Sequence, residues 1–263
     1  MPPGIGSSVS EKPPEDDLGA IVSRFVPSPN HGDRREGRQP NLLLLHYTGM
    51  PTAEAALSRL CDPAAEVSSH YLVMEDGAVI QLVPEDRRAW HAGAASWAGE
   101  TDINSCSVGI EIVNPGHEGG LPPYGENQIA SVIGLCRAIV GHWGIRPDRV
   151  LGHSDVAPGR KEDPGELFPW DRLAASGIGH WVAPARVTGG AVLEPDDTGP
   201  EVEALQDALA FYGYGVETTG VLDLATRQVV TAFQRHFRPA RVDGVVDRST
   251  LATLQELIAT RPE

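Results

Sequence analysis

Leu42-Leu43-Leu44-Leu45-His46-Tyr47-Thr48-Gly49 is the stretch of sequence that decides the fold of this chain. The apolar run over 42–45 is short enough for a buried strand. It ends at His46, and α/β folds place their ligands at the ends of such strands. The stretch therefore predicts a buried strand that carries a histidine to a functional site.

Three further segments predict strands of the same sheet. Residues 70–74 and 78–83 flank Asp76-Gly77, a dipeptide that strongly favours a hairpin turn. Residues 107–113 are apolar and β-branched, which is typical of a central strand. These segments predict a sheet that contains at least one antiparallel pair.

Helices are expected between these strands. Apolar residues recur at helical spacing over 129–143, which predicts a long amphipathic helix that covers the sheet and ends at Gly144. Residues 52–60 read as a helix with Thr52 as its N-cap, and residues 170–175 as a short final helix. The order of elements indicates an α/β or α+β domain, with a mixed sheet flanked by helices.

The C-terminal part contains a short internal repeat. Thr219-Gly220-Val221-Leu222-Asp223-Leu224-Ala225-Thr226 is echoed 24 residues later by a segment that ends in Asp247-Arg248-Ser249-Thr250. In each copy a glycine permits a tight turn, and an aspartate caps a helix with threonine at its third position. With a further helix over 202–212, the repeat predicts a compact three-helix module. Before it, residues 180–198 are rich in Gly, Pro and Ala without a periodic pattern, as in a linker.

Composition excludes several classes of protein. The net charge is −15, from 21 basic and 36 acidic residues, so we expect no nucleic-acid partner. Apolar runs are all shorter than the roughly 20 residues that span a bilayer, and no signal peptide is recognisable at the N-terminus. Cys61, Cys106 and Cys136 show no metal or redox spacing, so each is expected to be a small buried hydrophobe.

The loop Val150-Leu-Gly-His153-Ser-Asp-Val-Ala-Pro-Gly-Arg-Lys161-Glu-Asp163-Pro-Gly165 carries an imidazole, an ammonium and a carboxylate among turn residues that oppose a helix. Together with His46, His153 and Asp163 would form a set of two nitrogens and one oxygen. Catalytic zinc sites use three protein ligands of this kind and leave the fourth position to water. A hydrogen-bonded His–Asp pair without metal is the open alternative.

Two charged residues strengthen the metal hypothesis. Glu111 interrupts the apolar strand over 107–113, where a carboxylate is costly unless it is paired or functional. Lys161 lies two residues before Asp163, so both side chains point the same way in an extended loop. Hydrolysis at zinc needs a base for the water proton and a cation for the oxyanion, and these two residues supply both. A mutual salt bridge remains their alternative role.

Other histidines have weaker claims to function. We expect His70 to be a structural residue that forms hydrogen bonds. Five more lie in loops or on polar helix faces and are expected to be structural or exposed: His31, His117, His142, His180 and His236.

At these residues the chain resembles the N-acetylmuramoyl-L-alanine amidases of the AmpD and AmiD type, the amidase-2 family. The resemblance covers about residues 24–175 and rests on five motifs: Leu-Leu-His46-Tyr-Thr, Ser68-Ser-His70-Tyr71, Trp90-His91-Ala92-Gly93, Asn104 to Asn114 with Gly109-Ile110-Glu111, and Gly152-His153-Ser154-Asp155 through Lys161-x-Asp163-Pro164-Gly165. It implies zinc held by His46, His153 and Asp163. It also implies Glu111 as general base and Lys161 as the residue that stabilises the transition state.

The resemblance implies a substrate as well. Family members cleave the amide between the lactyl group of N-acetylmuramic acid and L-alanine. The groove would be lined by the loop around Trp90, so the candidates for substrate contact are Tyr47, Trp90, His91, Ala92 and Asn114. For His91, a buried packing role stays open.

The C-terminal module is similar to peptidoglycan-binding domains. The motifs are Leu205-Gln206-x-x-Leu209, Gly213-Tyr214, Thr219-Gly220, Phe233-Gln234 and Asp243-Gly244. We therefore divide the chain into a disordered segment over 1–20, a zinc amidase domain over 21–179, a linker over 180–198 and a peptidoglycan-binding domain over 199–263.

The leading hypothesis is a monomeric zinc amidase that acts on peptidoglycan or muropeptides and is tethered to the wall by its second domain. The alternative is a non-catalytic protein that binds or senses peptidoglycan. A wall-binding module favours the cell envelope or periplasm. The missing signal peptide leaves open a cytoplasmic enzyme that recycles anhydro-muropeptides.

Overall fold

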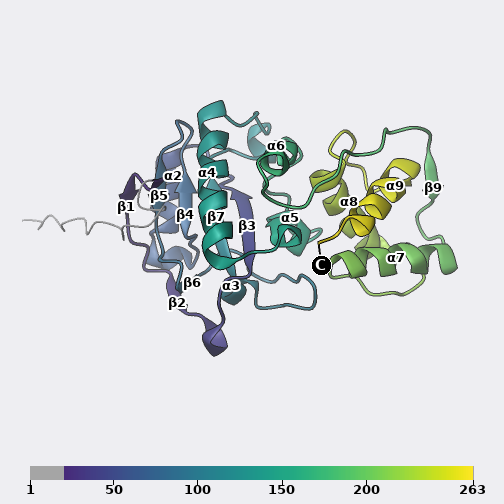
Figure 1. Cartoon of the computed structure of the whole chain (residues 1–263), viewed down its shortest axis with the longest axis horizontal. Coiled ribbons are helices and arrows are strands. Elements are labelled where there is room, and N and C mark those ends of the chain that lie inside the picture. Colours follow the sequence, from purple (N-terminus) through teal and green to yellow (C-terminus); the bar gives the residue numbers. More distant parts are fainter. Residues whose placement is uncertain (1–20, 263) are drawn as a thin grey trace, which may run out of the picture.

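The computed structural model describes residues 21–262, so the expected disordered segment over 1–20 lies outside the described residues. Its centre is a six-stranded mixed sheet with the order β1-β5-β4-β7-β3-β8 (Figure 1). Only β4 and β5 pair antiparallel among these described strands. The strands are β1 (Arg24–Phe25), β3 (Leu42–Tyr47), β4 (Tyr71–Val73), β5 (Val79–Gln81), β7 (Ser107–Ile112) and β8 (Val150–Gly152). The mixed α/β fold predicted from the sequence is confirmed.

The leucine run forms β3, which lies between β7 and β8 in the sheet. All four leucines have no exposed surface, as predicted for a buried strand. Successive side chains of a strand point to opposite faces. Leu43 and Leu45 therefore join the core under the long helix, whereas Leu42 and Leu44 join a second core on the other face.

Helix α4 (Glu126–Trp143) is the predicted long helix, and it covers one face of the sheet (Figure 1). It begins three residues earlier than the apolar pattern indicated, because its first turn is polar. Gly144 ends it with φ of 65°, in the left-handed region that favours glycine. Helix α6 (Trp170–Ala175) lies in the same core, through Trp170 and Leu173.

Several local predictions are confirmed. Helix α2 (Ala53–Leu60) is capped by Thr52, whose hydroxyl accepts from the backbone N–H of Ala55. The hairpin of β4 and β5 turns at Asp76-Gly77, where glycine has φ of 93°. The remaining elements of this part are β2 (His31–Asp33), β6 (Arg87–Ala89), α3 (Ile103–Cys106) and α5 (His153–Val156), with short 3-10 turns between them.

The C-terminal module consists of α7 (Pro200–Tyr212), α8 (Leu224–Phe237) and α9 (Arg248–Ala259). Asp223 caps α8 and Asp247 caps α9, and each carboxylate accepts from the N–H of the threonine three residues on, as predicted. In each copy of the repeat, the side chain of a glutamine holds the turn. Gln206 accepts from the N–H groups of residues 219 and 220, and Gln234 accepts from those of residues 243 and 244. The two copies are therefore the same clamped turn.

The segment over 180–198 is packed against both parts of the molecule. It contains β9 (Ala191–Leu193), which pairs antiparallel with β10 (Val246–Asp247). Trp181 packs against the core under α4 and also against the core that holds the C-terminal helices. The N–H and C=O of Ala185 bond to side chains of α9. The two modules are thus joined by an ordered segment.

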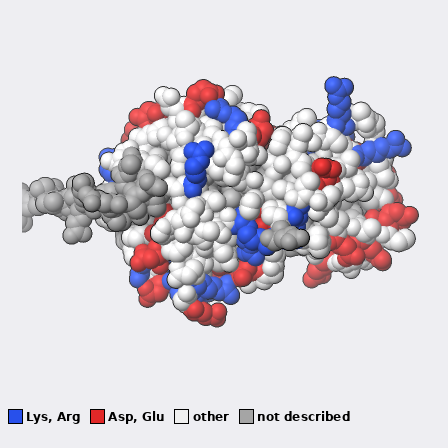
Figure 2. Space-filling view, in the orientation of Figure 1, with Lys and Arg blue, Asp and Glu red and all other residues white. Residues whose placement is uncertain are grey.

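One hydrophobic core joins the part that contains the six-stranded sheet to the C-terminal module. It contains Leu42, Leu44, Trp97 and Leu151, together with Tyr214 and apolar residues of the last three helices such as Tyr212. Figure 2 shows charged side chains dispersed over the outer surface of both parts. Within residues 21–262, no helix has the length and apolarity that a membrane crossing requires.

Candidate active site

The sheet register brings the candidate residues together. His46, near the end of β3, lies directly beside Glu111 of the parallel strand β7. Adjacent strand β8 leads into α5, whose first residue is His153. The loop then returns, and the carbonyl of Asp163 accepts from the N–H of Ser154. The prediction that the whole stretch over 150–165 is a non-helical loop was wrong at 153–156, because the turn residues that oppose a helix begin only at Pro158, after α5.

Three ligand atoms converge at this point. The Nδ1 atoms of His46 and His153 are 3.0 Å apart. Asp163 Oδ2 lies 2.8 Å from the first and 3.1 Å from the second. The three residues are buried and their ligand atoms lie within the reach of one metal ion. Ligands about 2.0–2.2 Å from a tetrahedral zinc would be about 3.3 Å apart, so a small adjustment would accommodate the ion.

Hydrogen bonds around the candidate ligands determine which ring nitrogen carries the proton and which presents a lone pair. His153 Nε2 lies 2.9 Å from the carbonyl oxygen of Ala92, which can only accept, so this nitrogen carries the proton. In a neutral ring Nδ1 then presents a lone pair to Asp163 and His46. Facing lone pairs repel unless a cation lies between them. This arrangement fits a metal ion better than a neutral His–Asp hydrogen bond.

His46 is oriented by a chain of hydrogen bonds. Its Nε2 lies 3.0 Å from His91 Nδ1, and His91 Nε2 lies 3.2 Å from the hydroxyl of Ser107, which donates to the Ile103 carbonyl. Because that carbonyl can only accept, His91 Nε2 donates to the Ser107 hydroxyl and His46 Nε2 donates to His91 Nδ1, so His46 Nδ1 is left free for a metal. Gly109 makes room for the chain, because a Cβ there would lie 2.6 Å from His91 Nδ1.

Burial sets the charges of these groups. It lowers the pKa of His46 to about 4, and the neighbouring His153 adds to this. Burial alone would raise the pKa of Asp163, but the two histidines together hold it below its ordinary range. A metal requires neutral imidazoles and an ionised carboxylate as ligands, and the lowered pKa values of His46 and Asp163 favour those forms of these two residues.

Glu111 has an unpartnered oxygen. Its Oε2 atom is buried without a hydrogen-bond partner in the described structure, and an unpaired polar atom of this kind is costly. Burial, and next the charge of Asp163, raise the pKa of Glu111 well above its ordinary value, whereas Lys161 opposes the shift. Among the described residues, Glu111 and Lys161 form no ion pair. The alternative of a mutual salt bridge is therefore not what the structure shows.

A cavity of about 430 Å³ opens over these groups. Five candidates for catalysis or substrate contact line it: Tyr47, Trp90, His91, Glu111 and Lys161. Ala92 and Asn114 lie behind its wall. The carbonyl of Ala92 bonds to His153 and Arg160, and the Asn114 side chain bonds to Pro122 and Gly116, so both shape the loops around the site.

Some residues near the site were not foreseen. Arg160 lines the cavity and binds the carbonyls of Ala92 and Ala94, although only the adjacent Lys161 was singled out. His117 was expected to be structural or exposed, yet it lies in the cavity wall and bonds to the Tyr47 hydroxyl at 3.0 Å. The sequence signal that could have identified His117 is its position just after Asn114 and Gly116, shortly beyond the end of a predicted strand.

Two histidines outside the cavity can be assigned. His70 is structural as predicted: its Nδ1 accepts from the N–H of Gly109, and its Nε2 faces the carbonyl of Arg87. The prediction for His236 was wrong in one respect, since it lies on a buried face of α8 and bonds to Asp155. Cys106 and Cys136 are buried, Cys61 is partly buried, and all three are free.

Both parts of the chain are similar to known proteins. Residues 36–166 match the N-acetylmuramoyl-L-alanine amidase family, and residues 198–254 match a peptidoglycan binding domain family. The chain is 38% identical over 229 residues to N-acetylmuramoyl-L-alanine amidase AmiD of Escherichia coli (strain K12), covering 82% of each sequence. It is 36% identical to 1,6-anhydro-N-acetylmuramyl-L-alanine amidase AmpD of Enterobacter cloacae, covering 59% of this chain and 90% of that protein.

Solved structures show the same fold. The complex of E. coli AmiD with its substrate anhydro-N-acetylmuramic acid-L-Ala-D-gamma-Glu-L-Lys superposes with a TM-score of 0.72 at 35% identity, covering 86% of this chain and 92% of that one. AmpDh3 from Pseudomonas aeruginosa superposes with a TM-score of 0.73 at 31% identity, covering 87% and 95%. The sequence motifs, the fold and the sequence identity to AmiD over most of both chains indicate the same family. The chain belongs to the family of N-acetylmuramoyl-L-alanine amidases and carries a C-terminal peptidoglycan-binding domain.

Proposed function

We propose that the enzyme is zinc-dependent and hydrolyses the amide between the lactyl group of N-acetylmuramic acid, in its ordinary or anhydro form, and L-alanine of the stem peptide. The observation that carries this proposal is the convergence of His46 Nδ1, His153 Nδ1 and Asp163 Oδ2 under a cavity that Glu111 also lines. Zinc bound there would act as a Lewis acid that activates water and polarises the scissile carbonyl.

Glu111 is the proposed general base. It lies beside His46 in the sheet register, and its free Oε2 has no competing donor. Its raised pKa makes it a stronger base than an exposed glutamate, so it can take a proton from the attacking water and deliver it to the departing amine. Burial of the carboxylate thus serves the proton transfer directly.

Lys161 is the proposed partner of the developing negative charge. It lines the same cavity and is placed by the loop that also holds Asp163. An ammonium near the carbonyl oxygen stabilises the charged transition state more than the neutral substrate. The loop therefore supplies a metal ligand and an electrostatic catalyst together.

The proposed substrate-contacting residues on the cavity wall are Tyr47, Trp90 and His91. Stem peptides carry carboxylates, whereas the chain has a net charge of −15. Attraction must therefore be local. Arg59, Arg160 and Lys161 line the cavity, but four carboxylates line it too: Glu111, Glu118, Glu162 and Asp163. A bound zinc ion would therefore have to supply much of the positive charge. The substrate bound in the complex of AmiD supports a muropeptide as substrate, and the C-terminal domain supports action on the wall in the cell envelope. We propose that the enzyme acts as a monomer.

The first experiment compares two substrates. The zinc-loaded enzyme is incubated with intact sacculi and, separately, with soluble anhydro-muramyl-tripeptide. We expect release of peptides that begin with free L-alanine from both, and more efficient turnover of sacculi if the C-terminal domain binds the wall. Turnover confined to the soluble compound would support recycling instead. Binding of sacculi without cleavage of either substrate would contradict the proposed function and favour a sensor.

A further inference from the structure

The C-terminal module contacts the metal-ligand loop through buried hydrogen bonds. Asp155 lies two residues after His153 on α5 and has no exposed surface. Its carboxylate accepts from the N–H of Gly152 at 2.8 Å, at the start of the helix. Its other two partners come from the C-terminal module: the Tyr214 hydroxyl at 2.7 Å and His236 Nδ1 at 2.6 Å. The helix that carries His153 is therefore held from outside its own domain.

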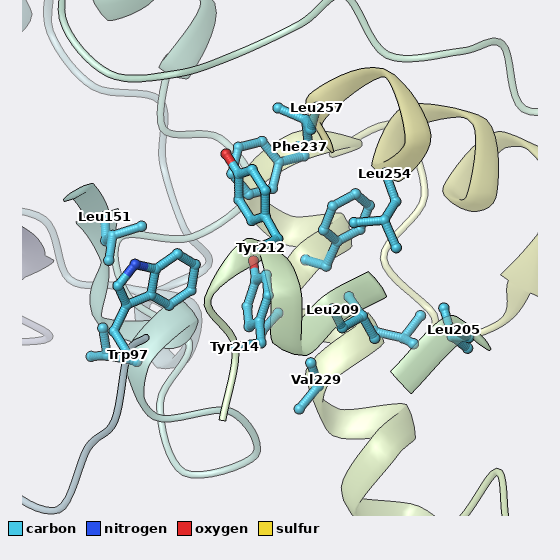
Figure 3. Close-up of a cluster of buried hydrophobic side chains, with 14 of the residues drawn as sticks. Trp97, Leu151, Leu205, Leu209, Tyr212, Tyr214, Val229, Phe237, Leu254 and Leu257 are labelled. Carbon is cyan, nitrogen blue, oxygen red and sulfur yellow. The ribbon is translucent and has the colours of Figure 1, made fainter. Parts of the chain in front are cut away.

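The same module holds the second element that orients His153. The ring of His153 donates to the carbonyl of Ala92, which begins the loop over 92–98. The N–H of Ala98 donates to the Gly213 carbonyl at 2.7 Å, and Trp97 forms a β-bridge with Tyr214. The ring centroids of Trp97 and Tyr214 are 4.9 Å apart with the rings edge to face, and Figure 3 shows the two side chains next to each other.

The glycine in this segment is required by the contact. Gly213 has φ of 141°, and a Cβ there would lie 2.5 Å from the Trp97 ring. The residues at 213 and 214 thus touch both elements that fix the ligand: α5 through Asp155, and the 92–98 loop through Trp97 and Ala98. The segment over 213–214 and His236 are hereafter called the docking face.

Further along the loop, α8 makes two more contacts. Arg235 is nearly buried, and it forms ion pairs with Glu162 at 3.2 Å and Glu166 at 3.3 Å, on either side of Asp163. Gly159 lies against the amide of Gln228, which a Cβ at 159 would approach to 2.3 Å. The module therefore follows the metal-ligand loop along most of its length.

We propose that the docking face is a positioning part of the metal centre, through which the peptidoglycan-binding module sets the orientation of His153. This inference rests on the proposed zinc function. It gives the module a second task besides wall binding. Groups that orient metal ligands from outside the coordination sphere typically change metal affinity about 10–100-fold when they are removed. The module should therefore influence zinc affinity even where no peptidoglycan is present.

The test uses two matched tyrosine variants of the full chain. Tyr214→Phe removes the hydroxyl that holds Asp155. Tyr212→Phe removes an equally buried hydroxyl of the same module, which bonds to His180 Nδ1 at 2.9 Å and not to the loop. Zinc dissociation constants are measured by competition with a chelator, and the visible spectrum is recorded for the Co²⁺-loaded proteins.

We expect Tyr214→Phe to weaken zinc binding about 10-fold and to change the Co²⁺ spectrum, and Tyr212→Phe to leave both unchanged. His236→Phe keeps a ring against Trp170 but loses the hydrogen bond to Asp155. We expect it to behave like Tyr214→Phe, and it replaces that variant in the test if Tyr214→Phe does not fold. Wild-type affinity and spectrum in both docking-face variants would overturn the inference. Absence of zinc binding by the wild-type protein would contradict the proposed function itself and the inference with it.

Discussion

Gly109 shows how one missing side chain shapes the site. It lies on β7 opposite Leu44, two residues before Glu111. His91 crosses the sheet at this glycine and reaches His46. Any larger residue would push the imidazole away from His46, because protein interiors are close-packed and leave no space for it.

We predict that Gly109→Ala lowers the free energy of unfolding by about 1–3 kcal/mol, as overpacked cores do. It should also weaken zinc binding, because His91 can no longer reach His46 Nε2. Chemical denaturation and chelator competition measure the two effects. Gly134→Ala is the matched control: a Cβ meets nothing within 4 Å there, and alanine favours the helix α4. Equal stability of both variants would contradict the packing argument.

At the level of single residues, the sequence identified the polar side chains that lie in otherwise apolar strands. His46 at a strand end and Glu111 inside an apolar strand could be named because a polar group there is costly unless it is used. Arg160 and His236 were missed for a physical reason. Their partners are backbone carbonyls and a carboxylate far away in the sequence, and only the tertiary fold brings them close.

Among the elements, the two clamped turns of the C-terminal module allow an internal comparison. Asp223 and Asp247 cap helices in the same way, each bonding to a threonine N–H. Their surroundings differ. Asp223 is partly exposed, whereas Asp247 is fully buried and pairs with Arg238, which is also fully buried, and with Arg241.

The difference predicts unequal costs for the same substitution. Asp223→Ala should lower the free energy of unfolding by about 1 kcal/mol, the ordinary loss of an N-cap. Asp247→Ala should lower it by about 3–5 kcal/mol, because it leaves the buried charge of Arg238 without a partner. Urea denaturation of both variants measures the difference. Similar losses would mean that the buried ion pair contributes little beyond the cap.

The elements that the sequence predicted are those with local signals. The hairpin at Asp76-Gly77 and the capped helices were recognisable because turn residues and caps act within a few positions. Strand β9 and helix α5 were not predicted. Each is only three or four residues long, and each is stabilised by partners distant in the sequence: β10 for the strand, and the docking face for the helix.

For the whole molecule, buried histidines couple stability to pH. Burial lowers the pKa of His46 to about 4, and burial with the Arg34 charge lowers the pKa of His70 to about 3. In the unfolded chain a histidine has a pKa near 6.5, so below this pH the unfolded state binds protons that the folded state does not. These histidines therefore lower the stability as the pH decreases from about 6.5 towards 4, whereas Glu111, whose pKa burial raises, opposes this fall because it takes up a proton in the folded state first.

The expected slope is about 1.4 kcal/mol per pH unit for each such histidine. Asp163 does not contribute in this window, since a carboxylate with a lowered pKa loses its effect only below the unfolded value near 3.9. Urea denaturation of the metal-free Glu111→Gln protein at pH 7, 6 and 5 measures the slope without the opposing contribution of Glu111. A free energy of unfolding that stays constant or rises on acidification would show that these histidines are accessible to protons in the folded state.

The central claim is that this fold assembles a zinc centre in which Glu111 moves the proton. Its most direct test is Glu111→Gln, which keeps the shape of the side chain and removes the base. Both proteins are loaded with zinc, their metal content is measured, and cleavage of anhydro-muramyl-tripeptide is followed by the appearance of peptide with free L-alanine. The account predicts one zinc in each protein and a rate at least about 100-fold lower in the variant. Wild-type cleavage by Glu111→Gln, or by metal-free enzyme, would contradict it.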